Sequence, residues 1–234
     1  MQRQELRVAH GSLTAALVGL LLAAAVHAQT GAADSAAGKA LYADCAFCHG
    51  AQGEGDERAD APKLTGYQAP YLTRQLQDFR DGRRGYLEDD IPGRQMALVS
   101  AVLADDAAIH DVVAYIQGLP DTPAPAAGSS PGRAFVWDSP YAEMGPGNPA
   151  RGESAYAVCG NCHGLQGEGV EVLGAPPLRG IQDWYLVRQM KYYRDGIRGA
   201  HPSDAPGQSM AIMAKTLGPE DQTIYDLVAY LNTL

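Results

Sequence analysis

Long hydrophobic runs are scarce in this chain of 234 residues. The one near the start, at 13–26, is shorter than the roughly 20 residues that a membrane-spanning helix needs. Arg3 and Arg7 precede it and a small-residue cleavage pattern follows it, which is typical of a secretory signal peptide. We predict that 1–28 is removed before Gln29 and that the soluble mature protein is exported to the periplasm. The alternative is an uncleaved membrane anchor.

Basic residues are also fewer than acidic ones. The chain has 18 Lys and Arg against 27 Asp and Glu, a formal net charge of −9. Loss of Arg3, Arg7 and Glu5 with the signal peptide makes the charge −10. Such acidity argues against nucleic acid or an anionic membrane surface as a partner and favours a positively charged docking face on the partner. The alternative is that the acidity serves only solubility.

Cysteines are few, and both pairs lie in the same motif. Cys45 to His49 and Cys159 to His163 each read C-x-x-C-H, the attachment pattern of haem c. Competing interpretations are a redox disulfide, a structural disulfide or half of a zinc site. Thioredoxin-like chemistry would require a βαβ pattern, which the sequence lacks, and zinc would require the two motifs to meet across a linker. The motifs therefore predict two covalently attached haem c groups.

The motifs belong to a repeat, since much of the chain matches itself after a shift of 114 positions. Gly38 then falls on Gly152, and Met96 falls on Met210. We predict one domain at 34–119, a linker at 120–147 and a second domain at 148–234. The linker opens with Pro, Ala, Gly and Ser, but its apolar residues, Phe135, Val136, Trp137 and Tyr141, suggest that part of it lies against a domain surface.

No segment shows the alternation of a convincing β-strand, whereas several have helical spacing. Asp34 or Ser35 is suited to cap a helix leading into the first motif, and Asn148 with Pro149 to begin its counterpart. Middle helices are predicted at about 71–81 and 183–195, and terminal helices from near 105 and 218. The fold class is all-α, with two tandem units. Each has a thin core, which a haem would supplement.

The chemistry assigns roles within each motif. Cys45, Cys48, Cys159 and Cys162 would present sulfur to the haem vinyl groups from adjacent turns of a helix. His49 and His163 would then supply the proximal imidazole to iron.

A sixth ligand is expected from Met96 and Met210. Each lies 47 positions after its histidine and just after a Pro-Gly segment, which we interpret as a loop folding over the haem. A lone Met is usually core packing, but the matching positions favour ligation. Met213 and His201 are rivals in the second half.

These motifs resemble the tandem dihaem cytochromes c of the cytochrome c4 type, within the class I cytochromes c. The resemblance implies that Gly38 and Gly152 let the last helix cross closely, at Tyr115 and Tyr230. It implies that the carbonyl oxygens of Pro62 and Pro176 accept hydrogen bonds from the ligand histidines. Arg84 and Arg198 could neutralise haem propionates, or could be solvated surface residues.

His/Met ligation predicts an electron carrier, not an enzyme, with no catalytic residues and no small-molecule substrate. Expected partners are a quinol-oxidising complex or a dehydrogenase as donor and a terminal oxidase or reductase as acceptor. One alternative is a subunit fixed in a larger respiratory or dehydrogenase complex, associated with the membrane. Another is a dihaem enzyme such as a peroxidase, which would require asymmetry between the halves.

Overall fold

This computed structural model describes residues 33–121, hereafter the first half, and residues 147–234, the second half. The predicted signal peptide and nearly all of the predicted linker, including Phe135 and Trp137, lie outside the described residues. The two halves belong to one compact unit, residues 33–234.

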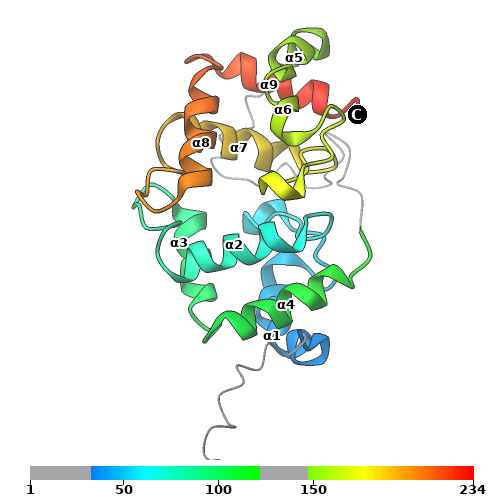
Figure 1. The fold of residues 1–234 in the computed structure, drawn as a ribbon, viewed down its shortest axis with the longest axis vertical. Coiled ribbons are helices and arrows are strands. Elements are labelled where there is room, and N and C mark those ends of the chain that lie inside the picture. The colour runs from blue at the N-terminus through cyan, green and yellow to red at the C-terminus, as the bar shows by residue number, and fades with distance from the viewer. Residues whose placement is uncertain (1–32, 122–146) are drawn as a thin grey trace, which may run out of the picture. The chain divides into compact units, whose positions relative to one another are not determined.

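Both halves use the same order of helices (Figure 1). The first has α1 (Ser35–His49), η1 (Glu57–Ala59), α2 (Ala69–Arg80), α3 (Ile91–Ser100) and α4 (Asp106–Gln117). The second has α5 (Pro149–Tyr156), α6 (Gly160–His163), η3 (Glu171–Leu173), α7 (Asp183–Arg194), α8 (Ala205–Lys215) and α9 (Asp221–Leu231). Within these two described stretches, β-structure is limited to isolated bridges. The all-α fold in two tandem units is confirmed.

The predicted helix starts are correct. The carboxylate of Asp34 accepts the N–H of Ala36 at 2.8 Å and caps α1. Asn148 accepts the N–H of Ala150 at 3.0 Å, with Pro149 in the first turn of α5. The halves differ further along. α1 runs unbroken to His49, whereas α5 ends at Tyr156 and α6 resumes after a tightened turn.

Two glycines allow the first and last helices of each half to cross closely. A Cβ on Gly38 would collide with the backbone carbonyl of Asp111 in α4, and a Cβ on Gly152 would collide with that of Asp226 in α9. Beside these crossings, the rings of Tyr42 and Tyr115 lie 5.1 Å apart, as do those of Tyr156 and Tyr230 at 5.4 Å. The helix crossing implied by the family resemblance is confirmed in both halves.

The interpretation of the Pro-Gly segments as loops is wrong. Pro92 and Gly93 form the first turn of α3, where Asp90 accepts the N–H of Gly93 at 2.9 Å. Asp204 caps α8 in the same way, accepting from Gly207 at 2.8 Å. Proline lacks the N–H that a first turn leaves unpaired, and therefore begins a helix here. Both candidate methionines lie on helices.

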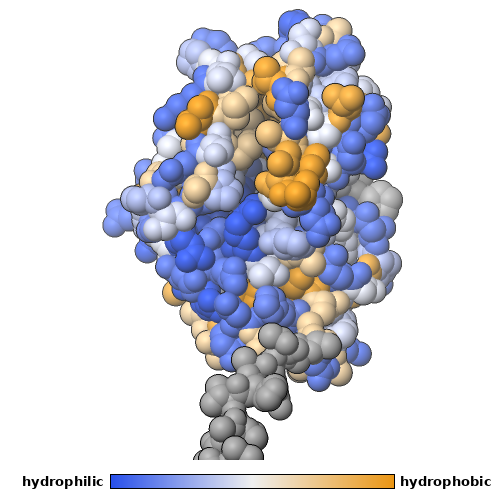
Figure 2. All heavy atoms as spheres, viewed as in Figure 1, coloured by the Kyte–Doolittle hydropathy of each residue, from blue (hydrophilic) through white to orange (hydrophobic). Residues whose placement is uncertain are grey.

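The surfaces of the halves differ in hydrophobicity. Figure 2 shows hydrophobic side chains gathered near η3 in the second half, while the first half presents a mainly hydrophilic face. Val172 is 90% exposed and Leu173 is 58% exposed. Their repeat counterparts are Arg58 and Ala59. The fold is shared, but the side chains that meet solvent are not.

Candidate haem sites

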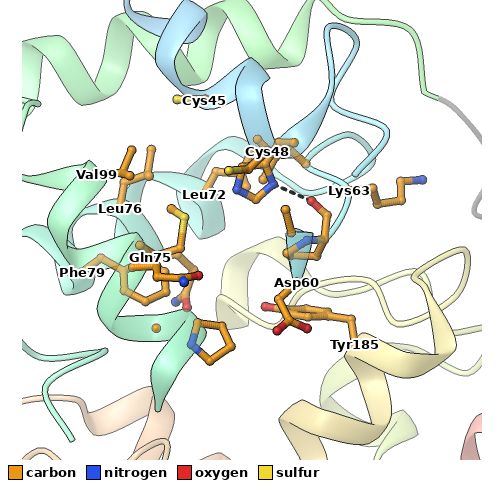
Figure 3. Close-up of a pocket in the computed structure, with 18 of the residues that line it drawn as sticks. Cys45, Cys48, Asp60, Lys63, Leu72, Gln75, Leu76, Phe79, Val99 and Tyr185 are labelled. Atoms are coloured by element: carbon orange, nitrogen blue, oxygen red, sulfur yellow. Dashed lines mark hydrogen bonds between the residues drawn. The ribbon is translucent and has the colours of Figure 1, made fainter. Parts of the chain in front are cut away.

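A large apolar cavity lies beside the first C-x-x-C-H motif. Including its opening to solvent, the space is about 1200 Å³. Cys45, Cys48 and His49 reach it from α1, and Met96 reaches it from α3. Leu72, Leu76, Phe79 and Val99 are among its apolar lining (Figure 3). The first set of predicted site residues is therefore brought together around one space.

Each motif histidine is buried and held by a carbonyl oxygen. Nδ1 of His49 lies 2.7 Å from the carbonyl of Pro62 (dashed line in Figure 3), and Nδ1 of His163 lies 2.8 Å from that of Pro176. A carbonyl can only accept, so each Nδ1 carries the proton and each Nε2 keeps its lone pair. Burial lowers the pKa of both histidines, which favours the neutral ring that a metal requires. The hydrogen bond implied by the resemblance is present in both halves.

The first cysteine of each motif is not suited to thiolate chemistry. Burial, with the nearby charge of Asp44, raises the pKa of Cys45 to about 11, and burial raises the pKa of Cys159. Reactive cysteines of redox motifs have lowered pKa values. Cys45, Cys48, Cys159 and Cys162 are all free of disulfide bonds. These observations favour attachment over a redox C-x-x-C.

The candidate sixth ligands differ in their surroundings. Met96 lines the first cavity together with His49. Met210 is partly buried against a cluster of Tyr193, Ala211 and Ala214. Its rival Met213, one turn later on α8, is 37% exposed.

The other rival, His201, lies in the loop before α8. Its ring meets that of Tyr86 edge-on at 5.5 Å, and its Nδ1 accepts the N–H of Ser203 at 3.1 Å. Met210 is therefore the better candidate, because burial holds its side chain in place.

Part of the first cavity is lined by the second half. Tyr185, Arg188 and Gln189, all on α7, line it, and Figure 3 shows Tyr185 at its edge. The sequence did not predict these residues, because the repeat only pairs equivalent positions of the two halves. It contains no information about which residues of one half contact the other. The site is consequently built from both repeats.

Arg84 and Arg198 lie between the halves in a reciprocal network. Arg84 donates to Gln75 at 2.6 Å and to Gln189 at 3.0 Å. Arg198 donates to Gln189 at 2.6 Å and to Gln75 at 2.7 Å. Each arginine thus binds one glutamine of its own half and one of the other, and Arg198 is buried. The interpretation of Arg198 as a solvated surface residue is wrong.

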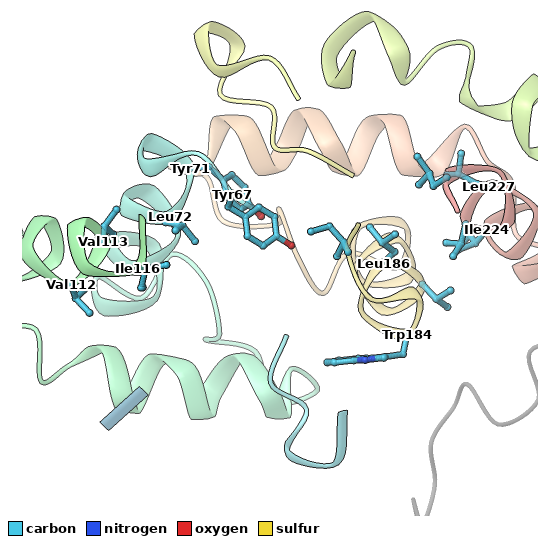
Figure 4. Close-up of a cluster of buried hydrophobic side chains, with 14 of the residues drawn as sticks. Tyr67, Tyr71, Leu72, Val112, Val113, Ile116, Trp184, Leu186, Ile224 and Leu227 are labelled. Carbon is cyan, nitrogen blue, oxygen red and sulfur yellow. The ribbon is translucent and has the colours of Figure 1, made fainter. Parts of the chain in front are cut away.

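The hydrophobic core also continues across the halves. Figure 4 shows Tyr67 and Tyr71 between the aliphatic side chains of the first half and those of the second. Trp184 and Leu186 belong to the same cluster. Burial of these side chains stabilises the contact between the halves by the hydrophobic effect, in addition to the hydrogen bonds of Arg84 and Arg198.

The cavity fits a haem. It offers apolar walls, paired sulfur atoms, an imidazole and a thioether, which is the donor set of His/Met haem c. Nε of Arg84 and Nε of Arg188 are buried without a hydrogen-bond partner among the described residues, and both side chains line the cavity. Such donors suit the carboxylates of haem propionates. When bound, haem supplies one-electron iron chemistry.

Comparison with known proteins agrees with two haem-binding domains. The sequence model of the cytochrome c family matches twice, at residues 35–120 and 149–234. The chain belongs to the cytochrome c family. Cytochrome c4 from Pseudomonas aeruginosa is 32% identical over 209 residues, which are 89% of this cytochrome and 92% of that protein. A thiosulfate dehydrogenase electron acceptor from Stutzerimonas stutzeri is 33% identical over 173 residues, 73% of this cytochrome and 72% of the relative.

Solved structures show the same fold. Reduced recombinant cytochrome c4 from Pseudomonas stutzeri superposes with a TM-score of 0.60 at 23% identity, covering 87% of this cytochrome and all of that chain. Thiosulfate dehydrogenase from Marichromatium purpuratum gives 0.59 at 25% identity, covering 85% of this cytochrome but 40% of the longer chain. With its two motifs, the protein is a dihaem cytochrome c of the c4 type that binds two haem c groups covalently and carries electrons.

Among the helices of the described residues, none is long and apolar enough to cross a bilayer.

Proposed function

We propose that this cytochrome is exported to the periplasm and shuttles single electrons between a quinol-oxidising complex or a dehydrogenase and a terminal oxidase or reductase. Cys45 and Cys48 bind one haem, with His49 and Met96 as iron ligands. Cys159, Cys162, His163 and Met210 do the same in the second half. In this proposal 1–28 is the signal peptide, 34–119 and 148–234 are the haem domains, and 120–147 connects them.

One observation carries the proposal. His49 and Met96 both line the same cavity, from the different helices α1 and α3, so that an iron held in that cavity could take both side chains as ligands. Such a site has no open position for a substrate, which favours outer-sphere electron transfer over catalysis at iron. The thioether ligand also favours a relatively high reduction potential.

The decisive test is the spin state of the oxidised protein. Both irons should be low-spin in electron paramagnetic resonance, and cyanide or peroxide should bind slowly. An internal methionine held by its helix competes with external ligands at high effective concentration. A high-spin signal from one haem in the intact protein would instead favour a dihaem enzyme such as a peroxidase.

Among donors, a thiosulfate dehydrogenase has direct support, because one relative is named as the electron acceptor of such an enzyme. Stopped-flow mixing with a purified thiosulfate dehydrogenase and thiosulfate should reduce this cytochrome within the turnover time of the enzyme. Faster reduction by a quinol-oxidising complex, with no reduction by the dehydrogenase, would assign the donor to the respiratory chain.

A second candidate is a fixed subunit of a larger complex. It is favoured by the match to 40% of a longer thiosulfate dehydrogenase chain. Fractionation separates the alternatives: a shuttle should be released with the periplasm, whereas a subunit should co-purify with a dehydrogenase or a membrane complex. Mass spectrometry of the mature chain, expected to begin at Gln29, tests export and cleavage together.

A further inference from the structure

The first haem cavity opens to solvent between side chains that line it and are also exposed. Five residues meet both conditions: Asp44, Ala59, Asp60, Gln95 and Val99. The first comes from α1, the next two from η1 and its C-terminal cap, and the last two from α3. We call these five residues the first rim. A protein that exchanges electrons with the haem of this half has to approach the opening, and therefore contacts the first rim.

The repeat places an equivalent rim in the second half. A shift of 114 positions gives Val158, Leu173, Gly174, Ser209 and Met213, which we call the second rim. All of them are exposed except Gly174, which is partly buried. Val158 is 48% exposed and Leu173 is 58% exposed. Two carboxylates of the first rim are thus replaced by a valine and a glycine.

The charges around the two rims differ. Asp44 and Asp60 carry the carboxylates of the first rim, and that of Asp60 forms an ion pair with the buried Arg188 of α7. The second rim has no ionisable side chain. Its cationic neighbour, Arg74 of α2, donates to the carbonyl oxygen of Gly174 at 2.9 Å. A basic face on a partner therefore meets carboxylates at the first rim and none at the second.

The second rim continues into further exposed apolar residues. Leu173 follows Val172, which is 90% exposed, and Met213 follows Ile212, which is 67% exposed. Figure 2 shows the hydrophobic side chains gathered near η3. Single exposed hydrophobic side chains are normal on a protein surface, but a patch of them marks an interaction site.

The first half also exposes apolar residues close to its rim, Phe47 and Leu98. Asp44, however, lies one turn before Phe47 on α1. An apolar partner that covered the first rim would remove this carboxylate from water without supplying a positive charge, which is costly. Val158 takes the place of Asp44 in the second rim, so that cost does not arise there.

We propose that the second rim is the docking surface for a redox protein with an apolar docking face, whereas redox proteins with a basic docking face bind at the first rim. This inference rests on the proposed electron-carrier function, because a protein that covers the opening of a haem site is placed to exchange electrons with that haem. The two halves then select partners by charge, and two partners of different chemistry do not compete for one site.

The test replaces the partners by gold electrodes coated with alkanethiol monolayers, one methyl-terminated and one ammonium-terminated. The intact dihaem protein should adsorb to the methyl surface and exchange electrons with it, with little dependence on salt. Val158→Asp and Leu173→Asp should each lower the adsorption constant about tenfold, because a carboxylate must then lose its water. A quartz microbalance measures the adsorbed mass, and cyclic voltammetry measures the electron exchange.

Matched variants separate the two rims. Asp44→Val gives the first rim the residue of the second, and should strengthen adsorption to the methyl surface and weaken adsorption to the ammonium surface. Val158→Asp should retain both haems, because Asp44 already stands before the first cysteine of its own motif. Val102→Asp is the control. It adds the same charge at a position of the first half that is 57% exposed, and should leave adsorption to the methyl surface nearly unchanged.

Three results would overturn the inference. If Val102→Asp weakens adsorption to the methyl surface as much as Val158→Asp, apolar residues of the first half are responsible. If sedimentation shows a dimer that Val158→Asp dissociates, the second rim is covered by another copy of this chain. If Phe135→Ala combined with Trp137→Ala strengthens adsorption, the predicted linker covers it. Haem content and spin state in solution test the electron-carrier function independently of these surfaces.

Discussion

The two halves share a backbone plan and differ most in charge. Residues 33–121 contain 15 acidic and eight basic side chains, whereas residues 147–234 contain nine and seven. The resulting net charges are −7 and −2. Helix order, the side-chain caps of α1 and α3 with those of their counterparts α5 and α8, the glycine crossings and the histidine hydrogen bonds are retained in both halves. The predicted haem-binding motifs are present in both halves, whereas the charged residues around them differ.

Residues at the helix crossings are more constrained than residues on the surface. A crossing glycine cannot change without a clash, so Gly38 and Gly152 match. Surface positions tolerate change, so the exposed Val172 stands where the first half has Arg58. The charge difference would attract basic partners more strongly to the first half than to the second.

The largest expected effect is loss of a haem from one half alone. Cys159→Ala combined with Cys162→Ala should give a protein with one covalent haem, because no thioether can then form in the second half. Intact mass should fall by one haem, and the absorbance per chain should halve. The mirror variant at Cys45 and Cys48 should behave alike. Retention of two haem masses in either variant would contradict the assignment of the motifs.

Replacing one methionine should alter one haem. Met96→Ala or Met210→Ala should each remove half of the charge-transfer band between methionine and ferric iron and lower one midpoint potential, since thioether ligation stabilises ferrous iron. Met213→Ala is the matched control, because Met213 is exposed. If Met213→Ala has the effect and Met210→Ala does not, the ligand of the second half is misassigned.

The helix crossings should be equally sensitive in both halves. A methyl group at Gly38 or Gly152 would press against the backbone of the last helix, and such overpacking costs about 1–3 kcal/mol of unfolding free energy. Denaturant titration of Gly38→Ala and Gly152→Ala should show similar losses. Gly118→Ala is the control, because Gly118 also has a negative φ and a Cβ there would lie 3.4 Å from its nearest neighbour, the carbonyl oxygen of Tyr115. A loss confined to one variant would mean that only one crossing is tight.

The smallest effect concerns acid stability. Asp226 accepts two hydrogen bonds from Arg151, at 2.5 and 2.9 Å, and these bonds lower its pKa to about 2. Its ionised form therefore stabilises the second half above the unfolded pKa of about 3.9, and this contribution is lost as the pH falls through about 2. Arg151→Ala should raise the acid-unfolding midpoint of that half modestly, because Arg151 is largely exposed.

The first half offers the mirror experiment. Ala37 occupies the position of Arg151, and Asp111 that of Asp226. Ala37→Arg should lower the acid-unfolding midpoint of the first half if the pair alone is responsible. Circular dichroism with haem absorbance during acid titration measures both variants. No change in either would show that the ion pair does not contribute.

Local signals in the sequence predicted the motifs and the caps at Asp34 and Asn148, because each depends on neighbours in the chain or on its repeat partner. The helix crossings at Gly38 and Gly152 were predicted from the family resemblance instead. The local signals failed at α3 and α8, where proline and glycine usually mark a loop but here begin a helix behind an aspartate cap. They also failed for Tyr185 and Arg188, which reach the first cavity from the other half. Contacts between repeats arise only when the chain is folded.

The hydrogen bonds between the two glutamines and the two arginines at the contact of the halves restrict how the two repeats can evolve. Gln75 receives hydrogen bonds from Arg84 and Arg198, and Gln189 receives them from the same two side chains. Replacing either glutamine would leave both arginines short of an acceptor in a buried place, at a cost on the order of 1–3 kcal/mol. The repeats can therefore drift apart on their outer surfaces, but at their mutual contact they must change in concert, and neither half is any longer an independent module.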